Sequence, residues 1–217
     1  METDVVIVGA GPAGIFTALE MRRRGSKQRI LIVEKGLAVE NRRCPKNVTG
    51  RCVNCKPYCH ITTGFSGAGA FSDGKLSLSY EVGGDLPTLI GERKAQEIID
   101  YADSIYMDFG ADSKIEGVNN SEAVKEIRRR AIQAGLKLVD CPIRHLGTEK
   151  AQDIYYAIEQ YLLQNGVDIM FGQACTNLIL ENGVCHGVTL ESGFTTTEVR
   201  AKHVVVATGR RGADWLE

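Results

Sequence analysis

The chain opens with Asp4-Val-Val-Ile-Val-Gly9-Ala-Gly11-Pro-Ala-Gly14 and, after an amphipathic stretch, continues with Arg29-Ile-Leu-Ile-Val-Glu34. An apolar run, a glycine-rich turn, a helical pattern and a second apolar run, in this order, predict a βαβ unit that binds a dinucleotide. In such a unit Gly9 permits the tight turn, Gly11 lets the backbone approach a pyrophosphate, and Gly14 lets helix and strand pack closely. Gly9, Gly11, Ala13 and Gly14 are therefore expected to offer backbone to the pyrophosphate, which the positive end of the helix dipole attracts.

Glu34 ends the second apolar run and lies about twenty residues beyond Gly14. A carboxylate at this place accepts hydrogen bonds from ribose hydroxyls and repels a 2′-phosphate. Glu34 therefore favours an unphosphorylated adenosine, such as that of FAD or NAD.

The composition bounds the class of protein. Of the 217 residues, 43% are hydrophobic and the formal net charge is −1, which allows a substantial core and gives no electrostatic reason to expect a nucleic acid or an anionic membrane as partner. No secretory signal or bilayer-spanning run is apparent, and seven cysteines without such a signal favour a reducing compartment. We expect a cytoplasmic protein that binds neither nucleic acid nor membrane; the sequence indicates no oligomeric state.

The middle of the chain combines a long loop with helices. Residues 36–85 are rich in Gly, Cys and basic residues and lack sustained periodicity, as functional loops do. Apolar spacing predicts helices over roughly 88–109, from Ser121 to Gly135, and from Thr148 to Asn165, with a short strand at 136–139.

The last quarter has the pattern of strands. Residues 167–171 form a short apolar run, and the segments 174–180, 184–191 and 194–200 are separated by turn residues, which predicts a β-meander. The run His203-Val-Val-Val-Ala-Thr-Gly209 is typical of a parallel strand buried on both faces.

The glycine triad, Glu34, the meander and the Ala207-Thr208-Gly209 end together resemble the FAD-binding flavoproteins of the glutathione-reductase-like superfamily. More narrowly, Gly67-Ala-Gly-Ala-Phe-Ser-Asp-Gly-Lys75 and Arg144-His-Leu-Gly-Thr-Glu149 look like segments of a bacterial family of FAD-dependent dehydrogenases. This resemblance implies an α/β fold, a Rossmann-like FAD/NAD(P)-binding domain with a β-meander crossover. In it, the opening strands lie beside the strand at 168–171.

The resemblance also implies a domain organisation. Residues 1–40 and 148–217 would form the FAD-binding domain, and residues 41–147 a Cys/Gly-rich loop plus helical insertion on the substrate side. Members of the family are longer, so the chain looks like an N-terminal fragment in which the flavin-ring and substrate sites are incomplete.

Further cofactor contacts follow from the same resemblance. Lys35 would line the adenosine cleft, the backbone of Cys175 would lie beside adenine, and Ala207, Thr208 and Gly209 would lie near the diphosphate or ribityl chain. The glycine-rich segment with Gly67, Ala68 and Gly69 could bring backbone N–H groups to the flavin or its phosphate; the alternative is a flexible loop tip.

Four of the seven cysteines, Cys44, Cys52, Cys55 and Cys59, lie within sixteen residues. Four thiolates suit a structural zinc or an iron–sulfur cluster, with His60 as a substitute ligand. A redox dithiol beside Lys46, Arg51 and Lys56 is a second interpretation, and four unrelated reduced thiols a third.

The leading functional hypothesis is an FAD-dependent oxidoreductase that passes hydride through flavin N5, with a small-molecule substrate or electron carrier as partner and NAD(P)H as a candidate donor. His145 is the candidate acid, although a lone histidine is more often structural. The alternatives are a single-domain dinucleotide-binding protein resembling thiazole-biosynthesis enzymes, and a non-catalytic nucleotide- or metal-binding module.

Overall fold

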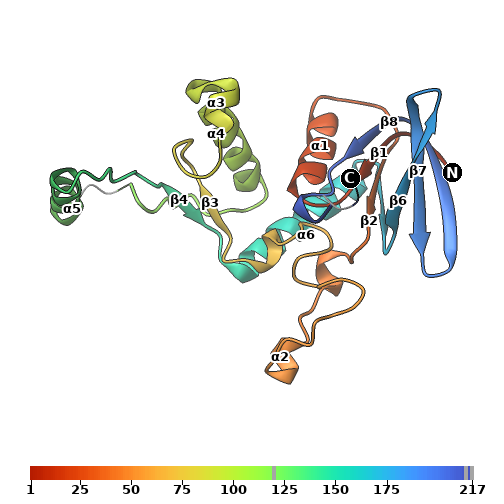
Figure 1. The fold of residues 1–217 in the computed structure, drawn as a ribbon, viewed down its shortest axis with the longest axis horizontal. Helices are drawn as coiled ribbons and strands as arrows, with labels where there is room; N and C mark the ends of the chain where they lie inside the picture. The colour runs from red at the N-terminus through yellow and green to blue at the C-terminus, as the bar shows by residue number, and fades with distance from the viewer. Residues whose placement is uncertain (119–120, 213–214, 216–217) are drawn as a thin grey trace. The chain divides into compact units, whose positions relative to one another are not determined.

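The computed structural model describes residues 1–118, 121–212 and 215 (Figure 1). The chain divides into two units, one made of Met1–Phe71 and Tyr155–Glu217 and the other of Ser72–Ile154. The sequence predicted domain boundaries at 40/41 and 147/148, which differ from the limits of these compact units. The predicted boundaries concern the FAD-binding and substrate sides, and they stay a prediction.

The first unit is built on a six-stranded sheet in the order β5-β2-β1-β8-β7-β6. Its strands are β1 (Glu2–Val8), β2 (Ile30–Glu34), β5 (Val167–Phe171), β6 (Ala174–Glu181), β7 (Val184–Ser192) and β8 (Thr195–Val206). Strand β1 pairs in parallel with β2 and β8, and β2 pairs in parallel with β5. The α/β fold with a largely parallel central sheet is therefore confirmed, and the opening strands do lie beside the strand at 167–171.

Strands β1 and β2 form the centre of the core. Residues 30–34 of β2 and 5–8 of β1 are all buried. Parallel strands covered on both faces need apolar residues at successive positions, which explains why both segments are continuous apolar runs and do not alternate.

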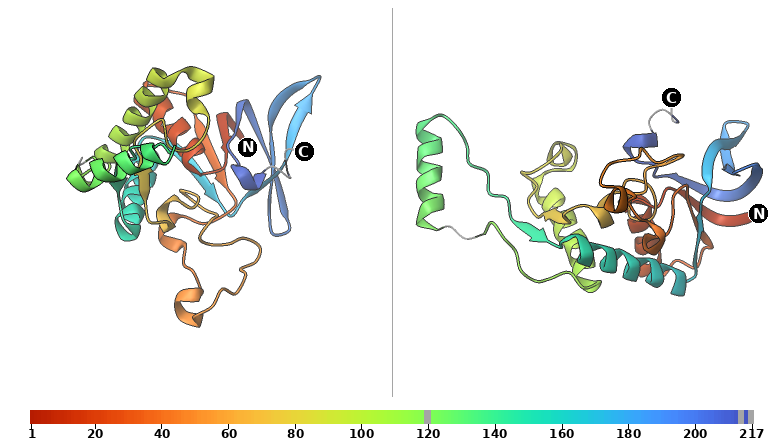
Figure 2. Two further views of the ribbon diagram at one scale, coloured as in Figure 1. Left: turned by 60° about the vertical axis from the view of Figure 1, so that its left-hand side comes forward. Right: turned by 90° about the horizontal axis from the view of Figure 1, so that it is seen from below.

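One strand replaces two that the sequence predicted. Residues 194–200 and 203–207 were expected to be separate, whereas β8 is continuous. Its first half pairs antiparallel with β7 and its second half, from Arg200 to Val206, pairs in parallel with β1. Figure 2 shows this long strand beside β7. No Gly, Pro or Asn interrupts residues 200–206, so nothing in the local sequence ends the strand between the two pairings.

Helix α1 (Pro12–Arg23) buries Ile15, Ala18 and Leu19. Its first turn lies directly against the end of β1, because a Cβ placed on Gly14 would come within 2.0 Å of the Gly9 carbonyl oxygen and 3.1 Å of Ile7. The predicted role of Gly14 in close helix–strand packing is thus confirmed.

Helix α6 (Thr148–Gln164) runs through the division between the two units. In the first unit it buries Tyr155, Ile158 and Leu162, the apolar stripe that the sequence predicted. A Cβ on Gly69 would lie 2.6 Å from the Tyr155 hydroxyl, so that glycine packs against the helix.

The loop after β2 carries short elements. They are the 3₁₀ turns Val39–Asn41 and Gly69–Phe71 and helix α2 (Lys46–Thr49), and a further 3₁₀ turn, Arg210–Gly212, follows β8. Figures 1 and 2 show α2 at the end of a long excursion away from the sheet of this unit.

The second unit holds α3 (Leu86–Ile90), α4 (Glu92–Asp108), α5 (Glu122–Gln133) and the antiparallel pair β3 (Lys75–Ser77) and β4 (Ile143–His145). The helix predicted over 88–109 is broken at Gly91, whose φ is +83°. As predicted, Ser121 caps α5 by accepting a hydrogen bond from the Val124 N–H. The strand predicted at 136–139 is wrong: that segment has no regular structure, and residues 143–145 pair with β3 instead.

Arg144 of β4 holds the second unit together. Its buried guanidinium donates to both carboxylate oxygens of Asp103, at 2.6 and 2.7 Å, and also to the Asp112 carbonyl. This paired contact joins β4 to α4 and gives residues 143–145 a buried anchor, whereas residues 136–139 are exposed apart from the half-buried Leu138.

Within the described ranges, no helix is long and apolar enough to cross a bilayer.

We predict that Gly14→Ala destabilises the protein, because the new methyl group would overlap the Gly9 carbonyl. Overpacking of this kind costs about 1–3 kcal/mol in the free energy of unfolding, measurable by urea denaturation. Gly11→Ala is the matched control, since a Cβ there meets no atom within 4 Å, and should cost at most about 1 kcal/mol as an N-cap change. Equal losses for the two variants would contradict the packing argument.

A second prediction concerns Glu159 of α6, which is 2% exposed and accepts one hydrogen bond, from the Val39 N–H at 3.4 Å. Burial raises the pKa of this carboxyl to about 7, and the charge of Glu40 adds to the shift. The folded state therefore keeps a proton that the unfolded chain releases near its ordinary pKa of 4.5. The stabilisation by Glu159 is complete below that pH and is lost as the pH rises through about 7.

Glu159→Gln should remove this loss, so that the variant gains stability relative to the wild type between pH 4 and 8, by at most about 3 kcal/mol. Urea denaturation at each pH measures it. Glu149→Gln, at an exposed position of the same helix, controls for the loss of one negative charge. Parallel pH curves for the wild type and Glu159→Gln would show that the carboxyl is not buried as described.

Candidate functional site

A cavity of about 380 Å³ lies at the carboxyl ends of β1 and β8 in the first unit. It is lined by nine residues predicted from the sequence: Gly9, Gly11, Glu34, Lys35, Gly67, Ala68, Ala207, Thr208 and Gly209. Pro12, Thr62, Thr63, Gly64 and Arg210 complete the lining. Segments far apart in the sequence therefore meet where ligands bind in open α/β sheets, beyond the carboxyl ends of the strands.

The start of helix α1 offers this cavity uncompensated donors. No side chain in the described part of the chain caps the helix, and its first turn contains no acidic residue. Pro12 has no N–H, so the donors left without a partner inside the helix include those of Ala13 and Gly14. Together with the positive end of the helix dipole they suit an anion. Ala13 and Gly14 are not among the lining residues, and their contact with a pyrophosphate stays a prediction.

Two further glycines set the shape of the cavity. A Cβ on Gly11 would meet no atom within 4 Å, so the space in front of it is open to a ligand. Gly9 has a φ of +104°, and a Cβ on it would lie 2.5 Å from the Ala207 carbonyl. Gly9 therefore serves both the turn after β1 and the close approach of the end of β8.

The glycine-rich segment lies opposite the start of α1. The Ser66 N–H donates to the Ala10 carbonyl at 2.8 Å, which ties the segment to the turn after β1. A Cβ on Gly67 would lie 3.8 Å from Gly11 Cα. Gly67 and Ala68 thus line the cavity, and their contact with the flavin or its phosphate stays a prediction, whereas Gly69 packs on Tyr155 and does not line the cavity.

Glu34 is 6% exposed at the end of β2. Its two carboxylate oxygens each accept one backbone hydrogen bond, from the Ala10 N–H at 2.9 Å and from the Gly36 N–H at 2.8 Å. Each oxygen keeps a lone pair that can accept from a ribose hydroxyl. The carboxylate therefore has a structural task that the sequence did not reveal, in addition to the ribose contact predicted for it.

A second cavity, of about 320 Å³, adjoins the first and shares Gly9, Glu34, Lys35 and Thr208 with it. Cys175 of β6 lies in its wall, where a contact with adenine was predicted. Burial raises the pKa of the Cys175 thiol to about 11, so the thiol stays protonated and unreactive at neutral pH. Trp215 completes the wall and donates from its indole N–H to the Thr176 carbonyl at 2.9 Å.

Some residues of this region were not predicted from the sequence. Thr62, Thr63, Arg210 and Trp215 line the cavities, and Arg42 is 3% exposed beneath the glycine-rich segment. None belongs to a motif with fixed spacing. The sequence carried one weak signal for a functional Arg42. It lies in residues 41–72, which contain five Lys and Arg residues but no Asp or Glu that could pair with them.

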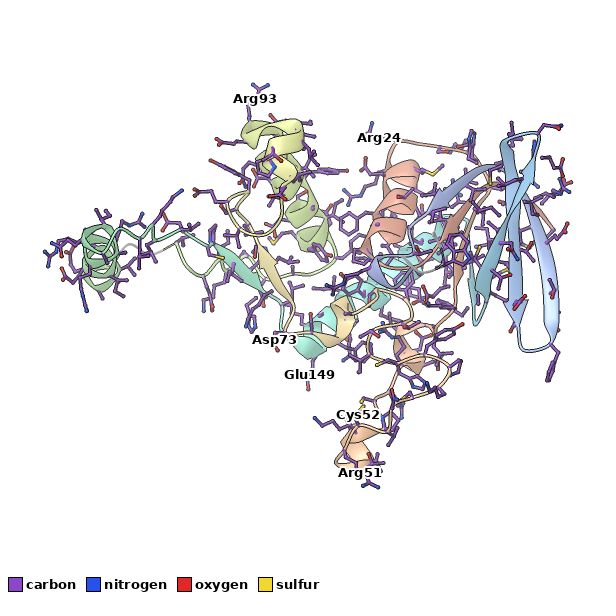
Figure 3. All side chains as sticks on the ribbon, in the orientation of Figure 1. Arg24, Arg51, Cys52, Asp73, Arg93 and Glu149 are labelled. Carbon is purple, nitrogen blue, oxygen red and sulfur yellow. The ribbon has the colours of Figure 1, made fainter. Side chains whose placement is uncertain are left out.

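The four clustered cysteines do not form a ligand set. Among the residues that the structure describes, no group of three or more His, Cys, Asp or Glu is placed to hold a metal ion. Figure 3 shows Cys52 at the outer end of the excursion around α2. No disulfide bond joins any of the seven cysteines, and the His60 Nδ1 lies 3.0 Å from the Arg43 carbonyl. The zinc and iron–sulfur interpretations are therefore unsupported, and the redox dithiol stays a prediction.

His145 belongs to the second unit. It lies exposed in β4, opposite Lys75 of β3, in a shallow hollow that also includes Asp73 and Glu116. Glu116 has its pKa lowered, mainly by its hydrogen bond to Lys114 and slightly by His145. The hollow is open to solvent, and a catalytic role for His145 stays a prediction.

Comparison with known families agrees with this geometry. A family model described as FAD binding domain matches residues 93–217, more than half of the chain, and a second model with the same description matches residues 2–44. The chain belongs to the FAD-binding domain family. The second match includes the glycine triad and Glu34, the residues that the sequence assigned to the dinucleotide.

Individual relatives are more distant. A protein of Clostridium beijerinckii described only as uncharacterized is 40% identical over 72 residues, 33% of this chain and 13% of that protein. A 3-ketosteroid-Δ4-(5α)-dehydrogenase from Rhodococcus jostii matches 94% of this chain and 45% of its own, with a TM-score of 0.57 and 17% identity. THI4 of Thermovibrio ammonificans matches 98% of this chain and 59% of its own, with a TM-score of 0.51 and 16% identity. The chain thus spans about half the length of these structures, and at such identities the likeness shows the fold.

We predict that Gly11→Val weakens FAD binding by about tenfold or more without unfolding the protein, because the side chain would occupy the open space before the start of α1. Quenching of flavin fluorescence measures the affinity. Gly183→Ala is the matched control: its φ is +78° and no atom surrounds it, so it should lower the free energy of unfolding by about 1–2 kcal/mol and leave FAD affinity unchanged. Wild-type affinity in Gly11→Val would exclude a pyrophosphate at this position.

Proposed function

We propose that this chain is the FAD-binding part of an FAD-dependent oxidoreductase. The observation that carries the proposal is the cavity at the carboxyl ends of β1 and β8, in which an uncapped helix start faces a glycine-rich segment beside a buried carboxylate. Family membership supports the cofactor, and the fold shared with a dehydrogenase supports the class of reaction. The substrate remains unassigned.

The residues present fit FAD. The backbone N–H groups of Ala13 and Gly14 would hold the pyrophosphate, with the cations of Lys35 and Arg210 at the rim of the cavity. Glu34 would accept from the ribose, and the wall formed by residues 174–176 would contact adenine. These contacts bind and orient the cofactor and keep water from its phosphates.

When bound, FAD supplies the hydride acceptor, since no protein side chain performs that step. The chain's own contribution is position and electrostatics. The same proposal includes NAD(P)H as electron donor and a small-molecule substrate or carrier as partner. It also includes a reducing, cytoplasmic location, which suits seven cysteines that form no disulfide.

A second candidate is a dinucleotide-binding protein that performs no flavin redox chemistry. The fold shared with THI4 of Thermovibrio ammonificans supports this candidate, because the match covers 98% of this chain and 59% of that one. The two candidates share the cavity and differ in which dinucleotide is retained and whether it changes redox state.

The test is anaerobic reconstitution with FAD, gel filtration to remove free flavin, and a visible spectrum before and after addition of NADH, NADPH or dithionite. We expect stoichiometric flavin whose absorbance bleaches on reduction and returns in air, and Gly11→Val, treated identically, should retain little flavin. Retention of NAD in place of FAD would favour the second candidate. A folded protein that retains neither would contradict both.

A further inference from the structure

Arg42 makes an unusual set of contacts for a buried cation. Its Nε donates to the His60 carbonyl at 2.9 Å, one terminal nitrogen donates to the Phe65 carbonyl at 2.5 Å, and the other donates to the carbonyls of Ile61 and Gly67, each at 2.7 Å. The first terminal nitrogen also reaches Ser66 Oγ at 3.2 Å. Four backbone carbonyls between residues 60 and 67 therefore converge on one guanidinium.

This convergence decides which way the glycine-rich segment presents its polar groups. The carbonyls of Phe65 and Gly67 point toward Arg42, and Ser66 adopts a φ of +76° that only the surrounding contacts make tolerable for a residue with a side chain. Within the described residues, the N–H groups of Gly64 and Ala68 have no hydrogen-bond partner, and both residues line the cavity. Two donors without a printed acceptor therefore belong to residues that line the same cavity as Gly11 and Pro12 at the start of α1.

The charge of Arg42 adds to this arrangement. Among the described residues its hydrogen-bond acceptors are four carbonyls and the Ser66 hydroxyl, with no carboxylate, and its guanidinium carbon lies 4.5 Å from the centroid of the Phe71 ring. Burial lowers the pKa of Arg42 to about 10, with partial compensation by Glu34, so the side chain stays positive at neutral pH. A positive charge that no ion pair neutralises raises the potential felt by an anion nearby.

We propose that Arg42 is a positioning residue for the dinucleotide pyrophosphate: it fixes the segment 60–67 so that the Gly64 and Ala68 N–H groups face the phosphates from the side opposite helix α1. The inference rests on the proposed function. Arg42 acts through the loop and touches no reacting atom. A guanidinium is needed because its five donors in a planar fork reach several carbonyls at once, which an ammonium does not.

The matched control is Arg22 of α1. Its guanidinium also donates to three backbone carbonyls, those of Ser26, Gln28 and Gly166, each at 2.9 Å, but none of these three residues lines either cavity, whereas Gly67, an acceptor of Arg42, does. Arg22→Met therefore removes a comparable set of hydrogen bonds without altering the phosphate side of the site.

The experiment compares the full chain with Arg42→Lys, Arg42→Met and Arg22→Met by calorimetric titration with FAD, ADP and adenosine. In the wild type, ADP should bind more tightly than adenosine because of its phosphates. Both Arg42 variants should weaken FAD and ADP by about tenfold or more while adenosine changes by less than about twofold. Arg22→Met should leave the ratio of ADP to adenosine affinity unchanged.

Amide NMR spectra supply a readout that does not depend on a ligand. Signals of Gly64, Gly67 and Ala68 should shift or broaden in the Arg42 variants, and those of β1 and β2 should not. If an Arg42 variant fails to fold, Ser66→Gly tests the same contact: it removes one acceptor of Arg42 and suits the positive φ, and it should lower ADP affinity several-fold in a folded protein.

The outcomes distinguish the positioning role of Arg42 from the proposed function. A wild type that binds FAD, with folded Arg42 variants that keep the wild-type ratio of ADP to adenosine affinity, overturns the positioning role alone. Rescue by Arg42→Lys would show that charge acts without the fork and would also overturn it. A wild type that binds neither FAD nor ADP overturns the proposed function, and the positioning role falls with it.

Discussion

The contact between the first turn of α1 and the end of β1 is the constraint on which the site depends. Only a residue without a Cβ fits at Gly14, because the Gly9 carbonyl already occupies the position that a Cβ would take. Gly9 in turn touches the end of β8 at Ala207. One crossing therefore fixes the helix start, the turn after β1 and the end of β8, and the donors of the helix come to lie where three chain segments leave a cavity.

Two buried charges then place the loops around that crossing. Glu34 joins the turn after β1 to the turn after β2 by accepting from Ala10 and Gly36. Arg42 gathers the carbonyls of the glycine-rich segment. Each ion is buried and hydrogen-bonded to the backbone, which offsets the cost of its desolvation. The same residues that order the loops thus set the electrostatics of the site.

The parts of this arrangement that local rules govern were predictable. The glycine triad, Glu34, the meander and the stripe of α6 follow from spacing within a few turns or strands, and the structure places nine of the predicted cofactor residues around one cavity. What failed depended on distant partners. Strand β8 is continuous because it exchanges β7 for β1 along its length, and β4 forms at 143–145 because Arg144 meets Asp103. Arg42 was missed for the same reason, since its acceptors lie 18 to 25 residues away.

The chemistry of the cavity is compatible with the low sequence identity, 16–17%, to two structures that share the fold. Most groups that face the proposed cofactor belong to the backbone, so the sequence is constrained only where a side chain must be absent, as at Gly9 and Gly14, or must carry a charge, as at Glu34 and Arg42. The remaining positions are free to vary as long as they stay apolar or exposed. A site built mainly from backbone groups can bind the same cofactor in chains of very different sequence. Specificity for the substrate then depends on other side chains, so one fold can serve enzymes with different substrates.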